Sequence, residues 1–203
     1  PPISTLFPYT TLFRSDVQCH LLLFSADKPG GNLHPFPGMT ASICQLRPES
    51  RGSVRIKSAD AAEAPDIRLN YLSTESDKRT MVAGLKLLRR VMGQPALKPY
   101  IAEERDPGPG CASDADLLAF IRQRGTTIFH PTSTCRMGID ELAVVDPQLR
   151  LKGVAKLRVV DCSVMPCVVS GNTNAGAIMI AEKAADLVLA DVQSAPVRGS
   201  AAA

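Results

Sequence analysis

The sequence predicts an α+β fold, because segments with strand and helix character follow one another in mixed order along its 203 residues. Short apolar or alternating segments fill the first third, and two segments with helical spacing of apolar residues come next. The last third joins a short apolar segment, a polar turn and a long helical pattern. With 45% hydrophobic residues, the chain can bury the core of one domain or slightly more.

Three segments of the first third are predicted to be strands. Val17–Phe24 is a continuous apolar run, and Met39–Pro48 alternates in part. Gly52–Lys57 alternates cleanly, with Val54 and Ile56 on one side. The residues PESRG between the last two segments contain the Pro, Ser and Gly of a turn, which predicts that these two strands form a hairpin.

Two helices are predicted in the middle of the chain. The first has Ser73 or Thr74 as its N-cap, and its apolar positions recur at helical spacing at Met81, Leu85, Leu88 and Met92. Ser113 and Asp116 have the spacing of a capping box, so they open the second helix, which ends at Gly125.

The last third is predicted to contain a strand, a turn and a helix. Residues 157–161 (LRVVD) form a short apolar strand that ends in a carboxylate. Residues 170–176 (SGNTNAG) form a polar turn, and residues 177–192 form a long helix. The small, polar residues 193–203 are expected to be a disordered tail.

Composition excludes several classes of protein. A net charge of +3 and the absence of a Lys/Arg run argue against nucleic-acid binding. No stretch approaches the about 20 apolar residues that a membrane span requires. The six cysteines form no C-x-x-C pair and no zinc-site spacing with histidine. Free thiols in a reducing compartment are expected, which indicates a cytoplasmic protein, with the parent enzyme at most peripheral to a membrane.

The chain has three histidines, and they are not equally good candidates for a catalytic role. His20 lies in an apolar run, where a satisfied core histidine is the expectation, and His34 is expected to face solvent in a Pro/Gly loop. His130 precedes Pro131, which keeps the backbone of His130 out of the helical region. An imidazole on such a rigid turn suits a proton acceptor, although a structural role explains the same residues.

The start of the last helix is a second candidate site. Its first N–H groups lack intrahelical partners and carry partial positive charge, so they suit an anion. Asn172, Thr173 and Asn174 add hydrogen-bonding side chains, and the flanking glycines let a flat ligand approach the backbone. Plain N-capping by one of these three residues accounts for the pattern equally well.

Three features in a fixed order point to a known family. HPTSTCRMG is followed by VVDPQLRLKGVAKLRVVDCSVMP and then by SGNTNAGAIMIAEKAADLV. This series resembles the C-terminal signature of the glucose–methanol–choline (GMC) oxidoreductases, and is most similar to their bacterial choline-dehydrogenase-like alcohol dehydrogenases. The resemblance extends back through QLRPESRGSVRIKS and IRLNYLS, and covers residues 38–192.

The resemblance implies FAD as cofactor and a small alcohol as substrate. By the same resemblance, His130 is the catalytic base and Asn172 is a hydrogen-bond partner of the substrate oxygen. Asp161 and the backbone of Cys162 become candidate FAD contacts, and the resemblance places Thr173 and Asn174 against the flavin ring. The alcohol would lose its hydroxyl proton to the base and a hydride to flavin N5. The positive end of the last helix would stabilise the charge of the reduced flavin.

One motif of the family is missing. No G-x-G-x-x-G turn follows a strand anywhere in the chain, although a Rossmann unit needs one. We therefore expect a fragment that lacks the N-terminal Rossmann unit and is inactive alone. Residues 16–140 would be the substrate-binding domain with its antiparallel sheet and helices. Residues 141–192 would return to the FAD-binding domain and supply its last strand and helix.

Residues 1–15 (PPISTLFPYTTLFRS) differ in character from the rest of the chain. They resemble a non-native leader translated from a sequencing adapter, and a native irregular strand and loop is the other interpretation.

Several alternatives stay open from the sequence. An oxidase and a dehydrogenase differ only in the electron acceptor, and no residue of this chain distinguishes one from the other. A free-standing, non-catalytic binding domain that needs a partner chain is the alternative from another class. The absence of Trp and the presence of only three Tyr mildly favour an aliphatic alcohol over choline, which prefers an aromatic cage.

Overall fold

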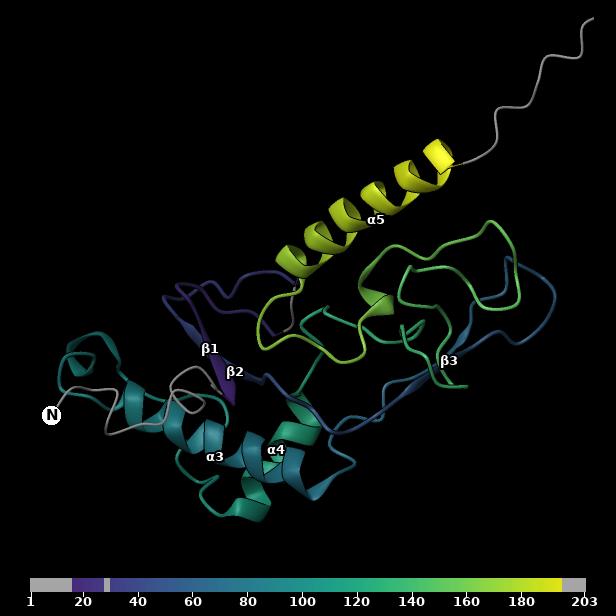
Figure 1. The fold of residues 1–203 in the computed structure, drawn as a ribbon. Coiled ribbons are helices and arrows are strands. Elements are labelled where there is room, and N and C mark those ends of the chain that lie inside the picture. The colour runs from purple at the N-terminus through teal and green to yellow at the C-terminus, as the bar shows by residue number, and fades with distance from the viewer. Residues whose placement is uncertain (1–15, 28–29, 195–203) are drawn as a thin grey trace, which may run out of the picture. The chain divides into compact units, whose positions relative to one another are not determined.

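The computed structural model describes residues 16–27 and 30–194, in two compact units that divide after Ile128. The first unit contains four strands, two α-helices and one short 3-10 helix among its described residues. The second contains one 3-10 helix and one long α-helix, α5, drawn in yellow in Figure 1. The mixed helix and sheet content agrees with the predicted α+β class. The predicted leader, residues 1–15, lies outside the described residues.

The four strands form two separate antiparallel pairs. Strand β1 (Val17–Leu22) pairs with β2 (Thr40–Gln45), and β3 (Ser53–Arg55) pairs with β4 (Asp66–Arg68). The predicted hairpin between the second and third strands is therefore wrong. The segment that was expected to form the turn of this hairpin contacts the next helix instead. The backbone N–H groups of residues 49 and 50 donate to a carboxylate of that helix. A Cβ on Gly52 would lie 2.1 Å from the Arg68 carbonyl oxygen, so β3 can approach the end of β4 only with glycine there.

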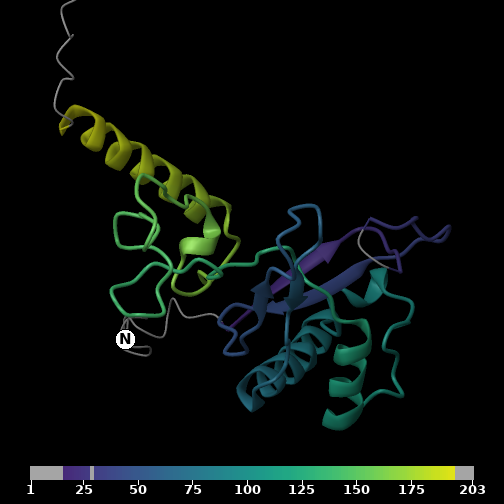
Figure 2. The same ribbon diagram turned by 90° about the vertical axis from the view of Figure 1, so that its right-hand side faces the viewer.

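Helix α3 (Glu75–Met92) packs on the β1–β2 pair, and Figure 2 shows it alongside the strands. Of the two predicted caps, Thr74 is the one used, since its side chain accepts from the Asp77 N–H at 3.2 Å. A Cβ on Gly84 would lie 2.6 Å from Cδ1 of Ile43, so this glycine lets the helix approach β2 closely. The helix ends at Met92 with Gly93 as its C-cap, two residues before Pro95, the residue that was expected to stop it.

Asp77 ties the 48–52 turn to the first turn of α3. Its two carboxylate oxygens accept from the N–H groups of Glu49 and Ser50 at 2.9 and 2.8 Å, and the residue is only 2% exposed. Burial by itself raises the pKa of Asp77, but the hydrogen bonds from Glu49 and Ser50 outweigh it and hold the pKa below its ordinary value.

Helix α4 (Asp114–Arg124) completes the core of the first unit. Its apolar residues Leu117 and Ile121 pack against Val82 of α3, and Leu117 is fully buried. The predicted capping box is present, because Ser113 Oγ accepts from the Asp116 N–H while the Asp116 carboxylate accepts from the Ser113 N–H. Gly125 ends the helix as predicted.

Replacing Ser113 with Ala is expected to lower the free energy of unfolding by about 1 kcal/mol, because the α4 N-terminus loses its cap. Urea unfolding followed by circular dichroism measures the change, and Ser113→Thr, which keeps the hydroxyl, should retain most of the stability. An unchanged unfolding midpoint in Ser113→Ala would show that the box contributes nothing.

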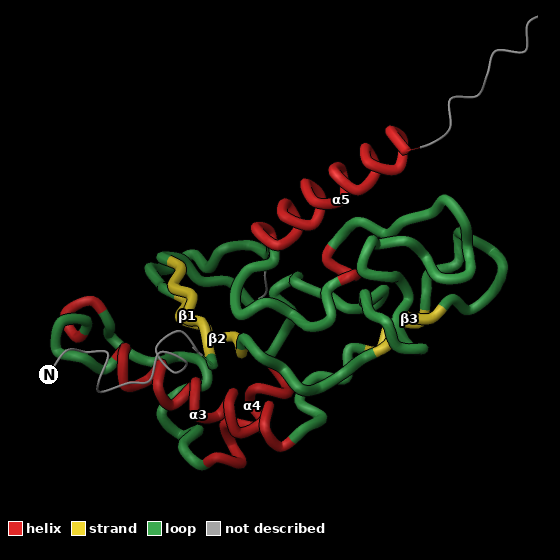
Figure 3. The backbone as a smooth tube through the Cα atoms, viewed as in Figure 1, coloured by secondary structure: helices red, strands yellow, loops and turns green. Residues whose placement is uncertain are grey.

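The second unit is built mainly of loops, which Figure 3 draws in green around the short 3-10 helix η2 (Cys162–Val164). Its core joins these loops to α5 (Asn174–Ser194) through the buried residues Val145, Leu149, Val164, Met165, Ile180 and Ala184. The predicted strand at residues 157–161 is wrong for the described structure. That segment forms one isolated bridge, between Arg158 and Arg150, so it has no continuous ladder partner.

Helix α5 begins and ends slightly differently from the prediction. It starts at Asn174, inside the expected turn, and runs through Ser194, so the first two residues of the expected tail are helical. The other tail residues lie outside the described part of the chain. The predicted division into residues 16–140 and 141–192 concerns which part of a larger protein each segment joins, and it stays a prediction.

Candidate active site

His130 lies on a loop of the second unit that is anchored to η2. The N–H groups of Cys135 and Met137 donate to the carbonyl oxygens of Ser163 and Val164 at 3.0 and 2.8 Å. Since Val164 is fully buried in the core, this ladder fixes the chain just after the histidine. The loop thus positions a half-buried imidazole on a rigid base.

The backbone beside His130 is unusual. Phe129 and Ser133, which flank the segment, have φ angles of 62° and 72°, in the left-handed region that bulky residues rarely adopt. Phe129 is also 70% exposed, although it is aromatic. Strain of this kind collects at functional sites, where the surrounding structure maintains it. No local sequence pattern predicted it, because neither residue is of a type that favours positive φ.

The start of α5 supplies two partners for the ring of His130. Asn172 Nδ2 lies 2.9 Å from His130 Nε2, and Thr173 Oγ1 lies 2.9 Å from His130 Nδ1. Asn172 is exposed, whereas Thr173 is only 7% exposed. An amide nitrogen only donates hydrogen bonds, so Nε2 is the acceptor and the neutral ring carries its proton on Nδ1. The structure therefore brings together His130 and Asn172, the two predicted catalytic residues, which are 42 positions apart.

The four predicted cofactor contacts have different surroundings. Asp161 is exposed and caps η2, with its carboxylate accepting from the Ser163 N–H at 2.7 Å. The thiol of Cys162 is half-buried and lies 3.9 Å from the carbonyl oxygen of Thr173. Asn174 is exposed as the first residue of α5. The hydroxyl of Thr173 contacts Nδ1 of His130, and the sequence did not predict this contact. For all four residues, flavin contact stays a prediction.

The two glycines of the helix start have separate uses. A Cβ on Gly171 would meet nothing within 4 Å, so the backbone there is open to a ligand. A Cβ on Gly176 would lie 2.6 Å from Cε of Met165, so this glycine serves the packing of α5 on the core. The expectation that the glycines admit a flat ligand thus fits Gly171 and does not fit Gly176.

Arginines hold the loops of the second unit to one another and to the later part of α5. Asp191, near the end of α5, accepts from Arg158 at 2.8 Å and from Arg150 at 2.9 Å. The hydrogen bond from Arg158, joined by that from Arg150, holds the pKa of Asp191 below its ordinary value. Arg136 similarly lowers the pKa of Asp140 to about 2, through a forked pair in the loop after the histidine.

The other two histidines belong to the first unit and have their own partners. His20 Nε2 lies 3.5 Å from Cys44 Sγ, so the ring has the expected partner, but the residue is half-buried and is not part of the core. His34 was expected to face solvent, and its side chain is half-buried, with 28% of it exposed. Its ring stacks on Phe36, with the centroids 4.8 Å apart, and its Nδ1 lies 3.0 Å from Ser25 Oγ.

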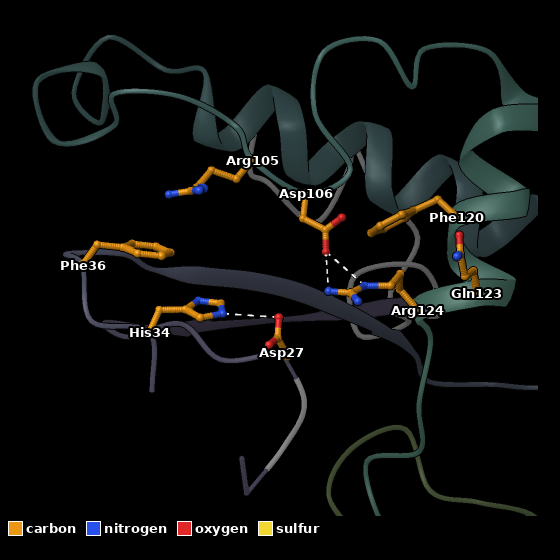
Figure 4. A pocket seen from close by; sticks show the side chains of 8 residues that line it. All are labelled: Asp27, His34, Phe36, Arg105, Asp106, Phe120, Gln123 and Arg124. Carbon is orange, nitrogen blue, oxygen red and sulfur yellow. Dashed lines mark hydrogen bonds and ion pairs between the residues drawn. The ribbon is translucent and has the colours of Figure 1, made fainter. Parts of the chain in front are cut away.

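Figure 4 shows the groove beside His34, which has a volume of about 460 Å³. The charged groups in it are paired with one another, Arg124 with Asp106 at 2.8 Å and His34 with Asp27 at 3.3 Å. Arg105 lies over the ring of Phe36 at 4.3 Å. Because these contacts already use the polar groups that a ligand would need, the groove is a weaker candidate than the His130 site.

Among the described residues, no group of three or more His, Cys, Asp or Glu side chains is arranged to hold a metal ion. None of the helices in the same part of the chain is long and apolar enough to cross a membrane.

The candidate site of this α+β protein is an imidazole held between an amide and a hydroxyl, beside the polar start of a long helix. Such a site is suited to proton transfer. Residues 48–181 match the profile of the C-terminal region of the family described as GMC oxidoreductase. The chain belongs to this family of FAD-dependent oxidoreductases, as its sequence resemblance predicted.

Relatives in the family oxidise small molecules. The chain is 43% identical over 187 residues to an alcohol dehydrogenase [acceptor] of Pseudomonas putida, a match that covers 92% of the chain and 34% of that protein. It is 43% identical over 173 residues to an oxygen-dependent choline dehydrogenase of Proteus mirabilis, covering 85% of the chain and 31% of the relative. The chain thus spans about a third of the length of the curated relatives it matches.

Solved structures of flavoenzymes share the fold. A pyridoxine 4-oxidase from Mesorbium loti has a TM-score of 0.72 and 34% identity, over 80% of this chain and 31% of that one. A formate oxidase from Aspergillus oryzae has a TM-score of 0.80 and 26% identity, over 92% of this chain and 33% of that one.

Proposed function

We propose that this chain is the C-terminal part of a flavoenzyme that oxidises an alcohol to an aldehyde or ketone, and that it is inactive without the flavin-binding part. The observation that carries the proposal is the contact between His130 Nε2 and the amide of Asn172 at 2.9 Å. The chain belongs to a family of FAD-dependent oxidoreductases, which supports a role for this pair in an oxidation that uses FAD. The proposal includes a cytoplasmic location, and a substrate-binding role for residues 16–140.

The residues of the chain would handle the proton and the substrate oxygen. His130 Nε2, the acceptor nitrogen of the ring, would take the hydroxyl proton of the alcohol. Asn172, exposed on the turn before α5, would donate its amide N–H to the substrate oxygen as negative charge develops there. The exposed Phe129 beside His130 offers an apolar surface to the carbon chain of the alcohol.

The helix start fits a polar, anionic ring system. The first N–H groups of α5 have no intrahelical partner and carry the positive end of the helix dipole. Exposed Asn174 and open Gly171 leave this end accessible. FAD, when bound, supplies the acceptor for the hydride that leaves the alcohol carbon. Asp161, Cys162, Thr173 and Asn174 remain the residues proposed to hold it.

Replacing Asn172 with Ala is expected to slow flavin reduction about 100-fold, because the developing alkoxide loses a hydrogen-bond donor. The measurement uses a chimaeric enzyme in which this chain replaces the matching segment of the Pseudomonas putida alcohol dehydrogenase. Bound flavin is confirmed by its absorbance. Its anaerobic bleaching is then followed in a stopped-flow instrument with a series of primary aliphatic alcohols and choline.

Asn32→Ala, which removes an exposed amide in the first unit, is the matched control and should bleach at the unaltered rate. A flavin-loaded chimaera that no alcohol bleaches would overturn the proposed activity. An Asn172→Ala variant with unaltered rate and substrate affinity would overturn only the role of Asn172.

A further inference from the structure

The β3–β4 pair carries an apolar face that is largely exposed. Val54 and Ile67 lie directly opposite each other in the register of the two strands. Side chains alternate along a strand, so the residues two positions further on, Ile56 and Leu69, lie on the same side. Between 48% and 88% of each of these four residues is exposed, and Ile56 is the most exposed. We propose that these four side chains, the ribbon face, form a docking surface for the upstream part of the parent flavoenzyme. This role rests on the proposed function, in which the chain is the C-terminal part of such an enzyme.

Two short strands do not make a stable sheet by themselves. β3 and β4 have three residues each, and a separate two-stranded pair is marginally stable in water unless its apolar face packs on another layer. Within the first unit, neither strand packs closely on any other helix or strand that the structure describes. Each of the two strands also has one edge that pairs with no other described strand. The pair therefore has a face and two edges that a further protein layer would complete.

The base of the pair is fixed, although its apolar face is open. Ser50 Oγ accepts from the N–H groups of Ser73 and Thr74 at 3.0 and 3.3 Å. Asn70 Nδ2 donates to the carbonyl oxygen of Arg51 at 2.8 Å. These bonds join the residues before β3 and after β4 to each other and to the N-terminus of α3. The ribbon face is therefore held in place before a partner arrives, and such preorganisation favours docking.

The ribbon face carries no charged side chain. The charged residues of the two strands alternate to the opposite side, where Arg68 pairs with Asp66 at 2.9 Å. A surface for an anionic membrane would combine apolar and basic residues on one side. An uncharged, apolar face instead resembles the centre of a permanent interface between parts of a protein.

The parent enzyme supplies an occupant for this face. The chain spans about a third of the length of its curated relatives, so about two thirds of such a polypeptide remains to cover the ribbon face. A segment of the same polypeptide is present at a high effective concentration, which a second copy of the protein would have to exceed. The upstream part of the same polypeptide is therefore the favoured occupant.

The test compares one substitution in the 203-residue chain and in the chimaeric enzyme. Ile56 is 88% exposed in the chain, so Ile56→Asp should change the melting temperature of the chain by less than about 2 °C. In the chimaeric enzyme the same carboxylate would be buried without a partner. The melting temperature of the flavin-loaded chimaera, followed by circular dichroism, should therefore fall by about 5 °C or more.

Two further variants are the controls. Lys57→Asp introduces the same carboxylate one residue later, on the opposite side of the strand, and Ile56→Leu keeps the face apolar. Both should leave the melting temperature of the chimaera within about 2 °C of the unaltered value. Equal melting temperatures of the unaltered and the Ile56→Asp chimaera would overturn the proposal. An equal loss in the chain alone would also overturn it, because another part of the same chain would then cover the face.

Hydrogen exchange measured by mass spectrometry needs no substitution, and it decides the case if the Ile56→Asp chimaera does not fold. The amides of residues 53–57 and 66–69 should exchange at least about 10-fold more slowly in the unaltered chimaera than in the chain alone, because a covering layer must open first. Equal exchange in the two proteins would overturn the proposal. A dimeric chimaera that Ile56→Asp converts to a monomer would do so too, because a second copy would then be the occupant.

These readouts are independent of catalysis. If alcohols bleach the flavin of the chimaera while Ile56→Asp leaves its melting temperature unchanged, the docking surface is wrong and the proposed function stands. If no alcohol bleaches the flavin, the proposed activity is wrong, and the melting temperatures still show whether the ribbon face is covered.

Discussion

Replacing His130 with Gln is expected to lower the limiting rate of flavin reduction in the chimaeric enzyme about 100- to 10,000-fold. The reason is that a glutamine amide cannot accept the hydroxyl proton, and loss of a general base costs this much in other enzymes. Substrate affinity should change much less, because Gln keeps a polar group near Asn172. Anaerobic stopped-flow bleaching by the alcohol that the unaltered chimaera oxidises fastest measures both quantities.

His34→Gln is the matched control for this variant. It removes an imidazole of similar exposure whose partners are Ser25 and Asp27 in the first unit. It should bleach at the unaltered rate. A His130→Gln chimaera that binds FAD and is bleached as fast as the unaltered protein would mean that another group takes the proton.

Replacing Asp77 with Ala is expected to lower the free energy of unfolding by about 2–4 kcal/mol, a larger loss of stability than that expected for Ser113→Ala. The variant leaves the N–H groups of Glu49 and Ser50 without their acceptor at a buried position, and each such loss costs about 1–3 kcal/mol. Urea unfolding at neutral pH measures the change. Glu75→Ala, an exposed acid in the same helical turn, is the control and should change stability little.

The effect of Asp77 should depend on pH. Its pKa is lowered in the folded chain, so its carboxylate stabilises the fold fully above the unfolded pKa, whose ordinary value is 3.8. That stabilisation is lost as the pH falls below about 4 and passes through the folded pKa. The stability difference between the unaltered chain and Asp77→Ala should therefore shrink in acid. A difference that stays constant down to the lowest pH at which the chain folds would contradict the pKa assignment.

Local patterns predicted the helices well because a helix is specified by residues close in sequence. The caps at Thr74 and Ser113 and the stop at Gly125 all follow from contacts within four positions. Strands β1, β2 and β3 were predicted as segments, but β4 was not predicted, and β2 and β3 were wrongly paired with each other. The turn after β2 is bound by Asp77, which lies 27 and 28 positions away from the N–H groups that donate to it, and no pattern of neighbouring residues shows such a contact. The expected strand at residues 157–161 failed for a related reason, since its single bridge partner is Arg150.

By itself, the sequence determined the α+β class and the family, and through the family resemblance it predicted His130 and Asn172 as the catalytic residues. These depend on residue type and order, which the chain carries in full. The tertiary structure alone decided that the two residues meet, and that Thr173 joins them from 43 positions away. It also decided that Gly176 serves packing rather than a ligand. The physical reason is that a hydrogen bond depends on distance and direction in space, and residues far apart in sequence acquire both only when loops and helix pack on a common core.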